Sequence, residues 1–455
     1  MAADKAAFRI LSPTAILGYG FPEASFLRGI ALRPDLIAVD AGSADPGPYY
    51  LGAGVAFTDR AAVKRDLRLM IRHARQRRIP VVVGSCGGSG AAPHLAWTRA
   101  ITEEILEEDG IAARVGLISA DVPADALIEA MRREEVVAAA GAVNALNEQS
   151  VRESTSLVAQ MGVEPIMEAL REGCDIVLAG RAYDPAVFAA LPMMRGYDPG
   201  LAIHLGKILE CAAIAADPGS GADCVLGILH EDSFELVPLS DDRRFTVDSV
   251  AAHSLYEKSD PVALPGPGGS LDLSQVSFDE EAGGRVRVRG SRFLPSEDYR
   301  VKLEGARRVG FRSICIAGVR DPIMIGSIRD ILTTVETRTA EAIAEEGIDG
   351  TLCFHVYGLD AVMGAREPVT TPTPHELGIV IEGIAPTEAA AATLCSLARS
   401  TLLHYGYPGR IATAGNLAFP FSPSDIKAGE VYEFSVYHLM TLRDQALFRL
   451  EVIDR

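Results

Sequence analysis

The sequence predicts an α/β protein with a parallel-sheet, Rossmann-like N-terminal domain, a β-rich connecting region and a ferredoxin-like α+β C-terminal domain. In the first half of the chain, short apolar runs alternate with amphipathic helical patterns, which is typical of a parallel sheet covered on both faces. The C-terminal part follows the order β-α-β-β-α-β. Because 455 residues are too many for one hydrophobic core, we expect domains at residues 1–218, 219–307 and 308–455.

The first domain is predicted from its apolar runs. We expect strands at residues 15–17, 36–39, 80–84, 114–118, 136–140 and 175–179, and helices at residues 60–76, 95–108, 123–133 and 151–172. Right-handed crossovers bring the carboxyl ends of parallel strands to one edge of the sheet. Small or polar residues follow these strands, so their loops are predicted to converge on a single cleft.

The later elements are predicted from weaker and then clearer patterns. Residues 219–307 contain a proline-glycine run and an alternation of arginine and valine at residues 285–289, which places the two residue types on opposite faces of a strand. In the C-terminal domain we expect strands at residues 311–317, 351–357, 377–384 and 432–440, with helices at residues 323–346 and 387–404.

Composition excludes several classes of protein. The formal net charge of −18, from 61 acidic and 43 basic residues, disfavours binding to nucleic acid and to anionic membranes. The chain has no apolar run long enough for a membrane span and no secretory signal pattern. Its seven cysteines form no CxxC pair, and HExxH is absent. We therefore expect a cytoplasmic protein with reduced thiols and no zinc motif.

Two carboxylates follow the predicted strand at residues 36–39. Asp40 stands at the strand end, and Asp45 lies in the glycine- and proline-rich loop VDAGSADPGPYYLGAG. This loop is either a tight turn, since these are ordinary turn residues, or a ligand loop at the carboxyl end of a parallel strand.

A glycine-rich turn, GSCGGSG, follows the strand at residues 80–84. Its backbone N–H groups, with Ser85, Gly87 and Gly88, are predicted either to cradle an anion or only to provide room for close packing. Cys86 is a candidate nucleophile because a helix N-terminus lowers the pKa of a thiol. His94 either points into the cleft or caps the following helix.

Further ionisable residues lie where predicted helices or strands are interrupted or end, and on one helix that is predicted to be buried. Glu164, before a proline, is a candidate general base, and Arg181 with Asp184 forms either a carboxylate-binding pair or a surface ion pair. His204, Lys207 and Glu210 share one face of an otherwise apolar helix, so they must pair, line a cavity or shift their pKa values. The remaining candidates for substrate binding are polar residues of other segments: Asn144, Gln160, His253 and Lys302.

Eight blocks of the sequence occur together in one order: VDAGSADPGPYYLGAG, GSCGGSG with PHL after it, QMGVEP, GRAYDPA, LAIHLGKILEC, SVAAHSLYE, VKLEGA and IAGVRDP. This set resembles the AtuA-type proteins of acyclic terpene utilisation. The resemblance implies a role in the catabolism of branched acids and CoA thioesters, and it implies a small extra domain that follows the chain or is supplied by a partner subunit. By resemblance the site positions are Asp40, Asp45, Gln160, Glu164, Asp184, His204, Lys207, Glu210, His253 and Lys302.

Together these features predict an enzyme that acts on a small branched carboxylate or its CoA thioester, as a hydro-lyase of the hydratase or dehydratase type. Glu164 or His204 would move the proton α to the carbonyl, with Asp184 in the same catalytic group, and Lys207 or Arg181 would hold the enolate or the carboxylate. The alternatives are a hydrolase that uses Cys86 or Ser85, and a non-catalytic binding subunit that needs a small partner chain. The cofactor is unknown; the carboxylates suit a divalent ion such as Mg²⁺. We also expect a homo-oligomer.

Overall fold

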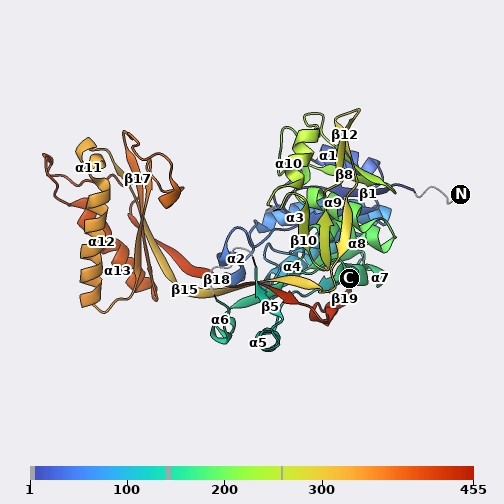
Figure 1. Cartoon of the computed structure of the whole chain (residues 1–455), viewed down its shortest axis with the longest axis horizontal. Helices are drawn as coiled ribbons and strands as arrows, with labels where there is room; N and C mark the ends of the chain where they lie inside the picture. The colour runs from blue at the N-terminus through green and yellow to red at the C-terminus, as the bar shows by residue number, and fades with distance from the viewer. Residues whose placement is uncertain (1–5, 140–144, 258–259) are drawn as a thin grey trace. The chain divides into compact units, whose positions relative to one another are not determined.

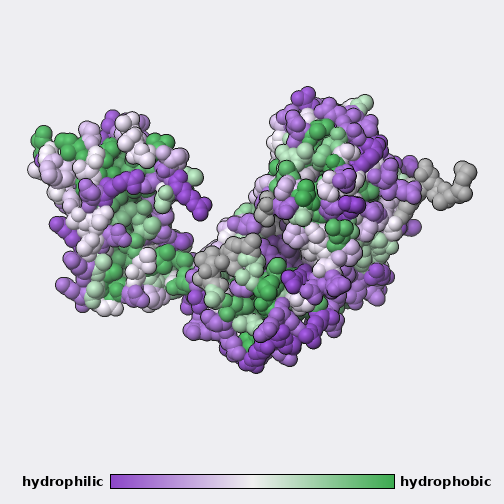
Figure 2. Space-filling model, in the orientation of Figure 1, coloured by the Kyte–Doolittle hydropathy of each residue, from purple (hydrophilic) through white to green (hydrophobic). Residues whose placement is uncertain are grey.

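The computed structural model describes residues 6–139, 145–257 and 260–455 and forms two compact units. The first unit comprises Met1–Arg307 and Phe434–Arg455, and the second comprises Arg308–Glu433. Figure 1 shows the elements of both units, and the face drawn in Figure 2 carries both hydrophilic and hydrophobic residues in each unit.

The first unit is built on a mixed sheet. Its central strands are parallel: β1 (Phe8–Ser12), β2 (Leu36–Asp40), β3 (Val81–Gly84), β7 (Ile176–Ala179) and β4 (Arg114–Ile118), in this spatial order. Antiparallel strands extend it beyond β1, namely β8 (Val225–Leu229), β9 (Ser233–Pro238), β13 (Arg285–Arg289) and β12 (Ser277–Glu281), and β19 (Leu450–Asp454) extends it beyond β4. The parallel sheet predicted for residues 1–218 is thus part of a larger mixed sheet, which includes strands from residues 219–307.

Helices cover both faces of this sheet. One face packs against α1 (Glu23–Ala31), α3 (Arg60–Arg77) and α4 (Ala92–Asp109), and the other against α7 (Glu164–Arg171), α8 (Asp184–Met194) and α9 (Pro199–Leu209). Successive residues of a strand therefore enter different cores, as Ile37 and Ala38 of β2 do. Burial on both faces explains why β2, β3 and β7 are continuously apolar in sequence.

Shorter elements complete the first unit. They are α2 (Pro48–Ala53), α5 (Ala124–Arg132), β5 (Val136–Ala138), α6 (Glu148–Arg152), β6 (Ser156–Ala159), η1 (Ala212–Ala215), α10 (Val247–Ser254), β10 (Ala263–Gly266), β11 (Gly269–Asp272), β14 (Arg292–Pro295) and η3 (Gln445–Leu447). The strands β10, β11 and β14 form a small antiparallel sheet.

The second unit follows the predicted order β-α-β-β-α-β. Its elements are β15 (Arg300–Val319), α11 (Pro322–Gly326), α12 (Ile328–Glu345), β16 (Thr351–Tyr357), η2 (Gly364–Arg366), β17 (Leu377–Ala385), α13 (Glu388–Leu403) and β18 (Asp425–Thr441). The strand order is β16-β17-β15-β18. Figure 1 shows α12 and α13 side by side, and both pack with the inward side chains of β17 in one core. The strands β15 and β18 both begin in one unit and end in the other.

Two local predictions are wrong. Residues 15–17 form a turn, and the first strand is β1, which the sequence prediction missed. The helix predicted at residues 151–172 is interrupted by β6, because residues 156–159 pair with Leu303–Ala306 of β15, a partner that is distant in sequence. The described part of the chain contains no helix long and apolar enough to cross a membrane.

Candidate active site

The site begins where three neighbouring parallel strands end. Asp40 is the last residue of β2, Ser85 follows β3, and Arg181 lies two residues beyond β7. Asp40 lies opposite Gly84 in the register of β2 and β3. A Cβ atom on Gly84 would lie 2.4 Å from a methyl group of Val187, so glycine is needed there for α8 to pack closely on the strand ends.

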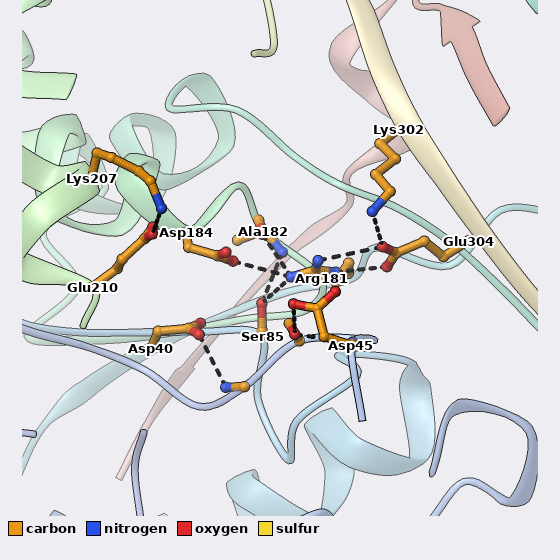
Figure 3. A network of polar contacts seen from close by, with 12 residues as sticks. Asp40, Asp45, Ser85, Arg181, Ala182, Asp184, Lys207, Glu210, Lys302 and Glu304 are labelled. Carbon is orange, nitrogen blue, oxygen red and sulfur yellow. Dashed lines mark hydrogen bonds and ion pairs between the residues drawn. The ribbon is translucent and has the colours of Figure 1, made fainter. Parts of the chain in front are cut away.

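Arg181 organises the polar side chains at this edge. It is buried, and its Nε donates a hydrogen bond to Glu304 Oε2 at 2.7 Å. Its Nη1 donates to Asp184 Oδ1 and to Ser85 Oγ, both at 3.1 Å. Lys302 Nζ lies 2.9 Å from the other oxygen of Glu304. Figure 3 shows Arg181 between Asp184 on one side and Glu304 on the other.

A further ion pair involves α9, in which residues 200–209 are buried. Lys207 lies in its last turn and pairs with Glu210, the residue that caps the helix, at 2.5 Å. The ammonium group of Lys207 also lies 5.3 Å from the ring centroid of Tyr256. Residues three apart share one face of a helix, so Lys207 and the C-cap residue Glu210 lie side by side, as Figure 3 shows.

These groups surround a cavity of about 320 Å³. We call it the polar cavity, and it is lined by residues of both ion-pair networks and by others from loops and from β18: Asp45, Gln160, Arg181, Tyr183, Asp184, Pro185, Lys207, Glu210, Glu257, Pro265, Lys302 and Tyr437.

Two carboxyl groups of the network hold protons more tightly than exposed carboxyls do. Burial raises the pKa of Asp40 well above its usual range, and the charge of Asp184 raises it further. Burial also raises the pKa of Asp184, against the opposing charges of Arg181 and Lys207. Asp40 Oδ2 accepts a hydrogen bond from the N–H of Gly42 at 3.1 Å, whereas its Oδ1 is buried without a hydrogen-bond partner among the described residues. Asp184 remains 26% exposed, so a ligand can reach it.

The cations of the network stay charged. Burial lowers the pKa of Arg181, Lys207 and Lys302, but the neighbouring carboxylates outweigh this effect and raise each pKa above its ordinary value. Burial by itself raises the pKa of Glu304, yet the charges of Arg181 and Lys302 lower it to about 2. Glu304 is therefore ionised at neutral pH.

The charge balance of the cavity depends on the two aspartates. When Asp40 and Asp184 both hold a proton, the ion-pair networks comprise three cations, Arg181, Lys207 and Lys302, against two glutamates, Glu210 and Glu304. The cavity lining also includes the exposed side chains of Asp45 and Glu257. Within the networks the cations then outnumber the carboxylates by one, which suits one carboxylate or one enolate oxygen of a ligand held among them. When Asp184 loses its proton, it becomes a base beside that ligand.

The structure brings together many of the residues predicted for the site. Those that line the polar cavity are Asp45, Gln160, Arg181, Asp184, Lys207, Glu210 and Lys302. Asp40 and Ser85 lie directly behind them in the network. His253 is buried and stacks on the ring of Tyr256 at a centroid distance of 5.4 Å. Burial, with the charge of Lys207, lowers the pKa of His253 to about 4. Asn144 lies outside the described residues.

Other predicted residues lie elsewhere. Glu164 accepts a hydrogen bond from the hydroxyl of Tyr299 at 2.6 Å and lines a separate cavity. His94 is fully buried, and its Nε2 lies 3.1 Å from the carbonyl oxygen of Tyr50 and 3.0 Å from that of Val55, so the ring fastens the loop around α2.

The glycine-rich turn is closely packed. A Cβ atom on Gly87 would lie 2.8 Å from Cβ of His94, and one on Gly88 would lie 2.9 Å from Cβ of Phe57. The N–H of Gly88 donates to the carbonyl oxygen of Ser85, so it already has a partner within the turn. Cys86 is fully buried, and burial raises the pKa of its thiol, which disfavours a thiolate nucleophile.

His204 is enclosed in the core behind the site. It has no exposed surface, its Nδ1 lies 2.7 Å from Ser291 Oγ, and its Nε2 lies 2.9 Å from Ser254 Oγ. Burial, with the charge of Lys207, lowers its pKa to about 3. The ring packs edge-on against Phe234. We interpret His204 as a neutral residue that positions α9.

This environment makes stability depend on pH. Below about pH 6.5 the unfolded chain protonates His204, whereas the folded protein does not do so until about pH 3, so stability falls as the pH is lowered through this range. Replacing His204 by Gln is expected to make the free energy of unfolding less dependent on pH between pH 7 and 5 in urea titrations. His375→Gln, at a side chain that is 79% exposed, is the control. An unchanged pH dependence in His204→Gln would contradict the assignment.

The predicted site residues did not include Tyr183, Glu257 and Tyr437, three polar side chains that line the cavity. Tyr183 lies within the segment that follows β7, and burial raises its pKa, as do the charges of Glu210 and Asp184, so its hydroxyl stays a hydrogen-bond donor. Its position in the sequence between Arg181 and Asp184 could have identified it as a site residue. Glu257 ends the block SVAAHSLYE, which was the signal for it, whereas Tyr437 carried none, because the strand β18 reaches the cavity only in the folded chain.

The carboxylates of the polar cavity do not form a preformed metal site. Among the described residues, the side chains whose possible ligand atoms all lie within 4.8 Å of one another are Cys353, His355 and Glu382 of the second unit. The cavity thus offers no such group of three ligand atoms for a divalent ion, and the reaction proposed below uses no metal.

Comparison with known proteins gives one family. The family model described as acyclic terpene utilisation family protein AtuA matches residues 59–220 and 240–426. No curated protein matches the chain, and no solved structure matches it.

Proposed function

We propose, from the premise that this chain belongs to the AtuA family of acyclic terpene utilisation proteins, that it is a catabolic enzyme acting on a small branched carboxylate or its CoA thioester. The reaction we propose is a hydro-lyase reaction, the reversible removal of water from a 3-hydroxyacyl group. The proposal rests on one observation: three side chains that this chemistry needs line the same cavity. They are Asp184, a carboxyl group with a raised pKa, Lys207, a cationic hydrogen-bond donor, and Tyr183, a neutral one.

The cavity contains the groups that this chemistry needs. In the dehydration direction, the ionised carboxylate of Asp184 takes the proton from the carbon α to the carbonyl. The electron pair moves to the carbonyl oxygen, where the ammonium of Lys207 and the hydroxyl of Tyr183 stabilise the negative charge. The enolate then expels the β-hydroxyl group, which takes the proton from Asp184 and leaves as water. Atoms and charge balance without an oxidant or a further reactant.

Arg181 and Asp40 support this role from behind. Arg181 is hydrogen-bonded to Asp184 and Glu304, so we assign it to orienting the base. Asp40, with its raised pKa, is a neutral acid behind that base, so it adds no negative charge next to Asp184.

Exchange of hydrogen for deuterium tests the proposal without knowledge of the natural substrate. In D₂O the protein is expected to incorporate deuterium α to the carbonyl of a branched 3-hydroxyacyl or enoyl compound, offered as free acid and as CoA thioester and followed by NMR. The double variant Lys207→Met/Glu210→Gln removes the oxyanion donor and its partner together, so no buried charge is left unpaired. It should exchange about 10²–10³-fold more slowly.

The outcomes separate the candidate functions. Exchange at the same rate in the double variant would contradict the role of Lys207. Binding of these compounds without any exchange would contradict the hydro-lyase reaction and would favour a binding subunit that requires a partner chain.

A further inference from the structure

A second cavity, of about 120 Å³, lies next to the polar cavity. We call it the apolar cavity. Most of its lining is aliphatic or aromatic, from α8, α9 and the small sheet of β10, β11 and β14: Met193, Ile203, Leu264, Leu271 and Phe293, with Val163 before α7. Its polar pair is Glu164 with Tyr299, whose hydroxyl donates a 2.6 Å hydrogen bond to Glu164 Oε2.

The two cavities share one wall. Tyr183 lines both, and in the strand β10 Leu264 and Gly266 line the apolar cavity while Pro265, between them, lines the polar one. A Cβ atom on Gly266 would lie 3.0 Å from two carbons of the Tyr183 ring, so the glycine lets this ring lie directly against the backbone. Tyr183 and the strand β10 therefore contribute to the walls of both cavities.

We propose that the apolar cavity is the subsite for the aliphatic end of a molecule whose carboxylate or acyl group lies in the polar cavity. The proposal rests on the proposed function and adds the part of the ligand that determines selectivity. An apolar lining favours a hydrocarbon over any polar group, since a polar group would lose its hydrogen bonds to water. At about 30 Å³ for a group the size of a water molecule, the cavity has room for about four methylene or methyl groups.

Saturated carboxylates test this subsite without any reaction. Straight-chain acids from propanoate to decanoate lack the hydroxyl group that would leave, so calorimetric titration measures binding alone. The affinity is expected to rise about fourfold with each methylene that enters the apolar cavity, the equivalent of about 0.8 kcal/mol, and to stop rising once the cavity is full.

A matched pair of methionines provides the variants. Met193 and Met194 are neighbours on α8, both are partly buried, and both pack against the same core, but Met193 lines the apolar cavity. Met193→Phe is expected to end the rise in affinity at a shorter chain, and Met193→Ala at a longer one. Met194→Phe and Met194→Ala should leave the length dependence as it is in the unmodified protein, with folding checked by circular dichroism.

The failure of this inference and the failure of the proposed function give different results. Carboxylates that bind with an affinity independent of chain length, or of Met193, would overturn the apolar subsite while leaving the polar site intact. If no carboxylate binds, the proposed function fails, and primary alcohols of the same lengths then test the apolar cavity alone. Alcohol binding that responds to Met193 would support the subsite, and an absence of binding would overturn it.

Discussion

Replacing Asp184 by Asn is expected to reduce kcat about 10²–10⁴-fold, because the amide keeps the shape of the side chain but cannot carry a proton. The rate of the unmodified enzyme should also rise with pH around a midpoint above the ordinary carboxyl pKa, since burial raises the pKa of Asp184. This rise should disappear in the variant. Steady-state rates of dehydration, or of α-deuterium exchange, measured across pH provide the test.

Asp121 offers a matched control for this prediction. It lies beyond the end of β4, the strand next to β7, but its carboxylate accepts a hydrogen bond from the N–H of Ala92 and does not line the polar cavity. Asp121→Asn keeps an oxygen acceptor for that hydrogen bond and should leave kcat and its pH profile unchanged. If Asp184→Asn retained the activity and the pH profile of the unmodified protein, Asp184 would not be the base.

Replacing Glu304 by Gln is expected to lower the free energy of unfolding by about 3–5 kcal/mol, because it leaves Arg181 and Lys302 buried without their anion. The side chains of Arg181 and Glu304 are only 3% and 1% exposed, so water cannot compensate for the lost charge. Urea unfolding at neutral pH measures the loss. Glu153→Gln, at the half-exposed pair with Arg307, is the control and should cost no more than about 1 kcal/mol.

The effect of Glu304→Gln on the free energy of unfolding should also depend on pH. The pKa of Glu304 is about 2 in the folded protein and about 4.3 in an unfolded chain, so the stability that Glu304 contributes is complete above about pH 4.3 and is lost as the pH falls toward 2. The difference in stability between the unmodified protein and Glu304→Gln should therefore shrink over this range. A difference that is the same at pH 7 and pH 3 would contradict the assignment of the shift to ionisation of Glu304.

Local sequence patterns were sufficient to predict the elements that are buried by segments close to them in the sequence. The runs that became β2, β3, β4 and β7 were predicted because helices close in sequence cover both of their faces. The order of strands and helices in the second unit was predicted because α12 and α13 pack against strands close in sequence, and along β17 buried residues alternate with partly buried ones. The strand β6 was not, because its partner β15 lies more than a hundred residues away and leaves no local period.

Some residues of the candidate site could likewise be predicted from the sequence, and others could not. Asp40, Ser85 and Arg181 could be predicted because the carboxyl ends of adjacent parallel strands must meet at one edge, wherever the rest of the chain goes. Lys207 and Glu210 could be predicted as a pair because helical spacing places them on one face. Glu164 and His204 carry equally suggestive patterns, yet tertiary packing surrounds one with apolar side chains and encloses the other between two serines.

The sequence by itself determined the α/β class, the acidic character and the carboxylates at the strand ends, because these follow from composition, period and chain direction. Only the tertiary structure decided which ionisable groups share a cavity, that Glu304 pairs with Arg181, and that Tyr183 lines both the polar and the apolar cavity. The physical reason is that burial and charge pairing set protonation and affinity, and both depend on neighbours that are brought together from distant parts of the chain.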